Sequence, residues 1–145
     1  SYAEDFLSSK HPDIKWRKPE YLPEGYRFST CYSMKYADSD FFGGAINYTA
    51  SSGDVEIPSE NISIWAQVDY PTPYPIWYSQ SIDPDEPSIV LEKVDFLPSA
   101  GLMTASKRGF IFYWMEDDTF YTLYVEGDQT RDEASKLASS LIISQ

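Results

Sequence analysis

Large apolar side chains occupy consecutive positions near the C-terminus instead of alternating with polar ones. Residues 110–115 read Phe-Ile-Phe-Tyr-Trp-Met, so a strand here carries bulky apolar groups on both faces. Residues 116–119 interrupt the run with Glu-Asp-Asp-Thr, and a second β-branched and aromatic run follows at residues 120–125. The pattern predicts a β-hairpin whose first strand must be covered on both sides.

A helix is predicted directly after this hairpin. Thr130 begins the sequence Thr-Arg-Asp-Glu, in which the Thr130 hydroxyl can accept from the backbone N–H of Glu133 while the Glu133 carboxylate accepts from that of Thr130. Apolar residues then recur along one helical face: Ala134, Leu137, Ala138, Leu141 and Ile142. We expect a helix over residues 130–142 that packs on a sheet, because so short a helix is marginal alone in water.

Alternating polar and apolar residues predict further strands upstream. The cleanest alternation covers residues 26–36, where aromatic residues, threonine and methionine predict a buried face, and Arg27, Cys31 and Lys35 fall on the wet face. Related patterns bounded by turn signals predict three more strands, at residues 42–50, 61–69 and 88–97, and a short strand or loop at residues 101–107.

Together these elements predict an α+β fold with a single antiparallel β-sheet of about six or seven strands and a C-terminal α-helix packed on it. No internal repeat, linker or low-complexity tract divides the chain. We expect one domain over residues 1–145, with an N-terminal arm at 1–20, the sheet at 21–126 and the helix at 130–142.

The best candidate for a functional loop is the segment of residues 70–78. The three prolines of this segment favour extended backbone and exclude a central strand. Its aromatic residues either present a rigid patch or pocket to a partner, or fold back as a lid over the end of the core. Trp65 is the other candidate. If it is exposed near Trp77, the two residues indicate a cleft; if it is buried under the C-terminal helix, it is part of the core. The candidate binding residues are Trp65, Tyr70, Tyr74, Trp77 and Tyr78.

The charge balance narrows the class of partner. Eleven basic residues against twenty-three acidic ones give a net charge of −12, which repels nucleic-acid backbones and anionic membrane surfaces. We therefore expect no nucleic-acid partner. The chain contains no long apolar stretch and begins at Ser1 without a methionine, so we expect a processed or excised piece that meets a membrane only through an anchor outside this chain.

Few residues offer catalytic or metal-binding chemistry. His11 and Cys31 are each the single residue of their type and belong to no nucleophile motif; we expect a solvated His11 and an unactivated, partly exposed Cys31. Aspartate pairs at residues 38/40, 83/85 and 117/118 fall in predicted turns, where aspartate serves backbone hydrogen bonding. The sequence predicts a non-catalytic protein without a metal site or cofactor.

Two motifs resemble a bacterial family of uncharacterised extracytoplasmic domains. One is Tyr-Leu-Pro-Glu-Gly-Tyr at residues 21–26, an LPxGY strand opening; the other combines Trp114, the Tyr-x-Leu of residues 121–123 and the helix sequence of residues 133–141. The chain is similar to domains found behind a membrane anchor in Gram-positive proteins, including anti-sigma-factor-like regulators. The resemblance implies a strongly curved antiparallel sheet related to lipoprotein carriers and sensor domains, and it carries over no catalytic residue.

Two functional hypotheses follow. In the first, the chain is a non-catalytic extracytoplasmic sensing or interaction domain, secreted or membrane-anchored, which binds a protein, a peptide or an envelope component with the aromatic edge of its sheet. In the second, it carries an apolar small ligand or lipid in the concave face of the sheet, which requires an apolar pocket of roughly a few hundred cubic ångströms.

Overall fold

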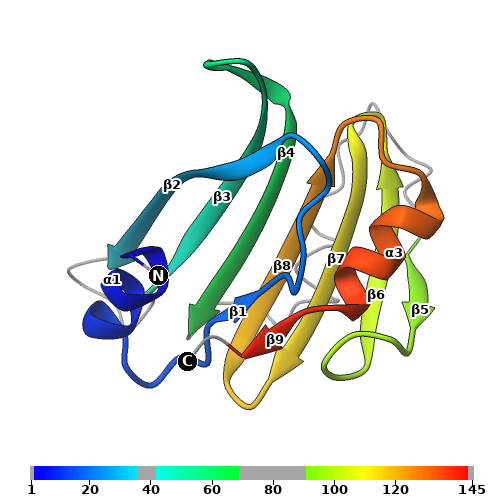
Figure 1. Ribbon diagram of the computed structural model, residues 1–145. Helices are drawn as coiled ribbons and strands as arrows, with labels where there is room; N and C mark the ends of the chain where they lie inside the picture. Colours follow the sequence, from blue (N-terminus) through cyan, green and yellow to red (C-terminus); the bar gives the residue numbers. More distant parts are fainter. Residues whose placement is uncertain (1, 36–41, 69–90, 144–145) are drawn as a thin grey trace.

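The residues that the computed structural model describes, 2–35, 42–68 and 91–143, form an open, curved seven-stranded antiparallel β-sheet (Figure 1). In spatial order its strands are β2 (Tyr26–Lys35), β3 (Phe42–Ser52), β4 (Val55–Val68), β8 (Thr119–Glu126), β7 (Gly109–Glu116), β6 (Gly101–Ser106) and β5 (Glu92–Val94). The predicted α+β class, with an antiparallel sheet and a C-terminal helix, is confirmed.

The two ends of the chain meet on one side of the sheet. Helix α1 (Tyr2–Lys10) lies beside the β2 edge, and helix α3 (Arg131–Ser139) lies over β7, both on the near side in Figure 1. Between them, β1 (Arg17–Lys18) pairs antiparallel with β9 (Ile142–Ile143). The N-terminal arm and the last described residues thus form a small second sheet.

Helix α3 begins where the sequence predicts and ends earlier. Thr130 Oγ1 accepts from the backbone N–H of Glu133 at 3.2 Å, and Glu133 Oε1 accepts from the backbone N–H of Thr130 at 3.0 Å. The predicted range of 130–142 is wrong at its C-terminal end. The backbone N–H and the hydroxyl of Ser140 both donate to the Leu137 carbonyl, at 3.0 and 2.7 Å, which closes the last turn and lets the chain extend into β9.

The strand predicted over residues 88–97 is much shorter in its described part, where only Glu92–Val94 pairs with β6. The next residues leave the sheet because they bury apolar side chains. The Phe96 ring packs edge-on against Phe112, with centroids 5.9 Å apart, and Leu97 is 7% exposed. The segment after β5 therefore packs Phe96 and Leu97 into the core and does not continue the strand pairing.

The pairing register assigns strand residues to two faces. The first face carries this row across the sheet: Cys31, Ile46, Ile64, Leu123, Phe112 and Met103. The second face carries the adjacent row: Tyr32, Ala45, Trp65, Thr122, Tyr113 and Leu102. Phe112 and Tyr113 follow each other in β7 and are 0% and 3% exposed, so this strand is buried on both faces, as its sequence predicts.

The first face forms the hydrophobic core beneath the helices. Leu7 from α1, Trp16 from the arm and Leu137 from α3 are buried and belong to the same cluster as the apolar row of the first face. Gly44 in β3 makes room for them, because a Cβ atom there would lie 2.8 Å from Leu7 Cδ2 and 3.2 Å from the Trp16 ring. Side chains therefore fill this face.

A β-bulge in β2 overturns the predicted orientation of the second half of this strand. The register shifts between Phe28 and Thr30, which leaves Ser29 as an extra residue. Beyond it the alternation moves by one position, and each side chain changes face. Cys31 packs against the core and not on the wet face as predicted, whereas Tyr32 turns to the second face, where it is 39% exposed.

An ion pair ties the N-terminal arm to the β7–β8 hairpin. Arg17 Nε donates to Glu116 Oε2 at 3.0 Å, and the two side chains are only 13% and 14% exposed. Glu116 Oε2 also accepts from Trp114 Nε1 at 3.0 Å. The Trp114 ring stacks on Tyr121 at a centroid distance of 5.1 Å, and the Tyr121 hydroxyl donates to the Lys15 carbonyl at 2.6 Å. Burial raises the pKa of Tyr121, so its hydroxyl stays protonated as this donor.

The packing at Gly44 predicts that Gly44→Val lowers the free energy of unfolding by about 1–3 kcal/mol, because the new side chain must displace Leu7 or the β2 backbone. Urea unfolding followed by circular dichroism measures the change. Gly53→Asn is the control: Gly53 has φ +64 and no atom within 4 Å of a Cβ, and asparagine tolerates this conformation. We expect less than about 0.5 kcal/mol there. Equal losses in both variants would contradict close packing of α1 on β3.

The Arg17–Glu116 pair predicts that Arg17→Met costs about 3 kcal/mol of stability, because Glu116 is left charged and withdrawn from water. Arg131→Met is the matched comparison, because the side chains of Arg131 and its partner Glu92 are 51% and 50% exposed. We expect this change to cost less than about 1 kcal/mol. Chemical denaturation of the two variants checks the difference. A loss at Arg17 no larger than at Arg131 would show that the arm does not depend on this pair.

Candidate functional site

The second face presents an aromatic pair near the β2 edge. Tyr32 in β2 and Trp65 in β4 both pair with Ala45 of the strand between them, so the two rings meet above a methyl group. Their centroids lie 5.3 Å apart in an edge-to-face arrangement with an interplanar angle of 80°. Ala45 is buried beneath them, Trp65 is half-buried and Tyr32 is exposed. Trp65 is flanked by strands on both sides, Tyr32 stands in the edge strand, and the pair reaches the surface through Tyr32.

A chain of polar side chains runs beside the aromatic pair, across β2, β3 and β4. Asn47 Nδ2 donates to Thr30 Oγ1 at 3.0 Å, and Ser63 Oγ donates to Asn47 Oδ1. Asn61 Nδ2 donates to Ser63 Oγ at 3.1 Å, and Thr49 Oγ1 donates to Asn61 Oδ1 at 3.4 Å. We call these five residues the amide ladder. The ladder fixes both amide groups in defined orientations on the sheet surface.

The Tyr32–Trp65 patch, defined as this aromatic pair and the amide ladder, contains no charged side chain. Arg27 and Glu126 border its far end, where they pair with Thr49 and Asn61. The second face of β2–β4 beside the pair is equally free of charge, at these positions: Thr30, Tyr32, Met34, Gly43, Ala45, Asn47, Ser63, Trp65 and Gln67. Burial raises the pKa of Tyr32, so its phenol is neutral at physiological pH. The second face around Tyr32 and Trp65 is thus uncharged, although the chain as a whole has a net charge of −12.

Among the predicted binding residues, Trp65 lies in this patch. It belongs to the face opposite α3, so it is not core beneath the C-terminal helix. Tyr70, Tyr74, Trp77 and Tyr78 lie outside the described residues.

Sequence reasoning missed Tyr32 and the amide ladder. The alternation of residues 26–36 predicts a buried Tyr32, because nothing in these residues signals the bulge at Ser29. A signal for the ladder exists: polar residues at 47 and 49 and at 61 and 63 alternate along two strands that pair with each other.

His11 is buried and not solvated as predicted. It is 8% exposed, with its ring stacked on Phe42 at 5.1 Å and tilted toward Trp16 at 6.2 Å. Its Nε2 atom has no hydrogen-bond partner among the described residues. Burial is the main cause that lowers the pKa of His11, and Lys35 and Lys10 lower it further against an opposing backbone hydrogen bond. The residue is therefore held in its neutral form as part of the arm's packing.

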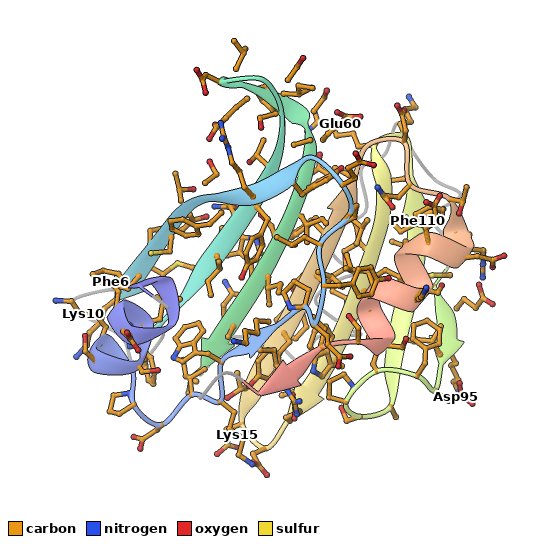
Figure 2. The ribbon with its side chains drawn as sticks, in the orientation of Figure 1. Phe6, Lys10, Lys15, Glu60, Asp95 and Phe110 are labelled. Atoms are coloured by element: carbon orange, nitrogen blue, oxygen red, sulfur yellow. The ribbon has the colours of Figure 1, made fainter. Side chains whose placement is uncertain are left out.

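Two recesses at opposite ends of the sheet are lined by charged groups. One, of about 720 Å³, lies where β4 bulges near Glu60 and is lined mainly by polar and charged residues: Ile57, Pro58, Ser59, Glu60, Lys107, Arg108, Glu126, Gly127 and Asp128. The other, of about 220 Å³, lies near Lys15 at the β7–β8 turn and has four carboxylates in its wall, from Asp13, Glu116, Asp117 and Asp118. Figure 2 shows Glu60 and Lys15 at these two ends. Neither recess resembles the apolar pocket that a lipid carrier needs.

The described part of the chain holds no group of three or more His, Cys, Asp or Glu residues arranged to bind a metal ion. In the same residues, no helix has the length and apolarity needed to cross a membrane.

The fold and the patch define an α+β domain with an open sheet and a neutral aromatic surface. Comparison with protein-family models, curated proteins and solved structures finds no match for this chain. Membership of the family that its LPxGY and C-terminal motifs resemble stays a prediction.

The burial of His11 predicts a stability that falls on acidification. Its folded-state pKa lies below the value of 6.5 in the unfolded chain, so below about pH 6.5 the unfolded state binds more protons. The contribution of neutral His11 to the free energy of unfolding is fully present above pH 6.5. It is lost as the pH drops from 6.5 toward the folded-state pKa of His11, by at most about 1.4 kcal/mol per pH unit. Urea unfolding at pH 7.5, 6.5 and 5.5 measures it. His11→Phe, which keeps a ring against Phe42, should flatten this dependence; parallel curves for the two proteins would refute it.

Proposed function

We propose that this chain is a non-catalytic sensing or interaction domain that acts outside the cytoplasm and binds a protein, a peptide or a component of the cell envelope through the Tyr32–Trp65 patch. The observation that carries the proposal is the edge-to-face pair of Tyr32, which is exposed, and Trp65, which is half-buried, fixed beside oriented amides on the second face of the sheet. The extracytoplasmic setting is supported by the resemblance of residues 21–26 and of the C-terminal motif to anchored bacterial domains.

The physical case for an interaction surface rests on exposure combined with rigidity. Tyr32 is 39% exposed although it stands in a ten-residue strand, and its partner Trp65 is held by hydrogen-bonded neighbours on both sides. Aromatic residues with few rotatable bonds lose little entropy on binding and bury large areas, which makes them common anchors of interfaces. A fixed pair of this kind is suited to recognition.

The carrier hypothesis has less support. The helix-covered face is filled by a continuous cluster of buried side chains from both helices, the arm and the sheet. The two recesses at the sheet ends are walled by charged groups, in which an apolar ligand would leave carboxylates and cations poorly solvated. The Tyr32–Trp65 patch does not carry this penalty, because its own side chains are uncharged.

Co-sedimentation with isolated Gram-positive cell walls tests the proposal. We expect the wild-type chain to be retained, and Trp65→Ala and Tyr32→Ala each to weaken retention about tenfold, since removal of an anchoring aromatic side chain typically costs more than 1 kcal/mol. Parallel samples of protease-treated walls separate a protein partner from an envelope polymer. Val55→Ala, at an exposed apolar residue (71%) near the β3–β4 turn, is the control and should leave retention unchanged.

Two results would contradict the proposal. One is the absence of retention on treated and untreated walls alike. The other is equal retention of the wild type, Tyr32→Ala and Trp65→Ala, which would place binding elsewhere on the chain. Unfolding midpoints of all variants show that any loss of retention does not come from loss of the fold.

A further inference from the structure

The absence of charge on the patch restricts the chemistry of its ligand. The rest of the chain supplies twenty-three acidic and eleven basic residues, yet none of them faces outward in the rows of Tyr32 and Thr30 across β2, β3 and β4. Arg27 and Glu126 lie beside the far end of the amide ladder, where they pair with Thr49 and Asn61, so this end has one charge of each sign. An anionic ligand centred on the aromatic pair would meet the repulsion of a −12 chain with no cation in the rows of Tyr32 and Thr30, and a cationic ligand would find no carboxylate there. The part of the patch around the aromatic pair therefore favours a neutral ligand.

The amide ladder retains hydrogen-bonding capacity for such a ligand. Asn47 uses one amide N–H on Thr30 and one carbonyl lone pair for Ser63, and Asn61 uses one of each for Ser63 and Thr49. A primary amide has two N–H donors and two acceptor lone pairs. Within the described residues, each asparagine thus keeps one donor and one acceptor, already oriented by its neighbours.

The aromatic pair supplies the complementary apolar contact. A pyranose ring has C–H groups on its flat faces and hydroxyl groups around its edge, so it packs on an aromatic ring while its edge bonds to amides. Strands lie about 4.8 Å apart, so the patch from β2 to β4 extends about 10 Å, close to the length of two sugar rings. An extended peptide would instead gain most from the backbone groups of a sheet edge, not from side-chain amides on the face.

We propose, building on the function proposed above, that the Tyr32–Trp65 patch binds a neutral glycan chain. Its sugar rings pack on Tyr32 and Trp65, and its hydroxyl or acetamido groups bond to Asn47 and Asn61. The proposal concerns binding only and involves no covalent step.

Isothermal titration of the full chain with neutral oligosaccharides tests this ligand class. The two probes are the β-1,4-linked tetramers of N-acetylglucosamine and of glucose. We expect measurable binding of at least one. Trp65→Ala and Tyr32→Ala should each weaken it about tenfold, and Asn47→Ala by a smaller factor. Tyr32→Phe keeps the ring and should stay within about twofold of the wild type.

Matched controls distinguish the patch from general surface effects. Phe28→Ala removes an equally exposed aromatic side chain (42%) of the same strand, but on the first face before the bulge, and should leave the affinity unchanged. A sulfated oligosaccharide and a neutral Gly-Ser-Asn peptide of similar length test the charge and the ligand class. We expect neither to bind in a manner that depends on Trp65.

The outcomes separate this inference from the proposed function. Binding of the peptide or the sulfated sugar in a Trp65-dependent manner, without binding of the neutral sugars, would overturn the glycan and leave an interaction surface in place. Retention on cell walls that depends on Trp65, by a chain that binds neither neutral tetramer, would also overturn the glycan and keep the interaction surface. Sugar binding that Tyr32→Ala and Trp65→Ala leave unchanged would overturn the assignment to this patch. Loss of both sugar binding and wall retention would overturn the inference and the proposed function together.

Discussion

Burial of the β7–β8 hairpin on both faces is the constraint on which the remaining structure depends. Phe112 and Tyr113 are neighbours in β7 and are both buried, although they point to opposite faces. A strand of this kind is stable only inside a sheet whose two faces are both shielded from water. Helix α3 shields the first face over β7, and it is too short to be stable without that contact. Helix and hairpin therefore stabilise each other.

The N-terminal arm completes the cover of the first face through contacts that are very distant in sequence. Arg17 reaches Glu116 across 99 residues, and Tyr121 reaches the Lys15 carbonyl across 106. Because the Arg17–Glu116 pair is mostly withdrawn from water, each charge depends on its partner, and the arm has one favoured position. The β1–β9 pairing then joins the arm to the chain's C-terminal segment, so the two ends of the described chain close over one core.

One extra residue gives the second face its character. The bulge at Ser29 shifts the alternation of β2, which moves Cys31 into the core and brings Tyr32 beside Trp65. The same shift aligns Thr30 with Asn47, so the amide ladder reaches the edge strand. A continuous alternation would have hidden Tyr32 under the arm. The Tyr32–Trp65 patch thus depends on a local irregularity more than on the regular sheet around it.

The sequence by itself determined the antiparallel α+β architecture, the two-sided burial of residues 110–115 and the capped start of the C-terminal helix, because these follow from side-chain periodicity and from contacts within a few residues. Only the tertiary structure decided that Tyr32 is exposed, that His11 is buried and that Trp65 lies opposite the helix. Those outcomes depend on a bulge, on the docking of the arm and on strand register. Each is settled by pairing partners distant in the chain, which periodicity within one segment does not reveal.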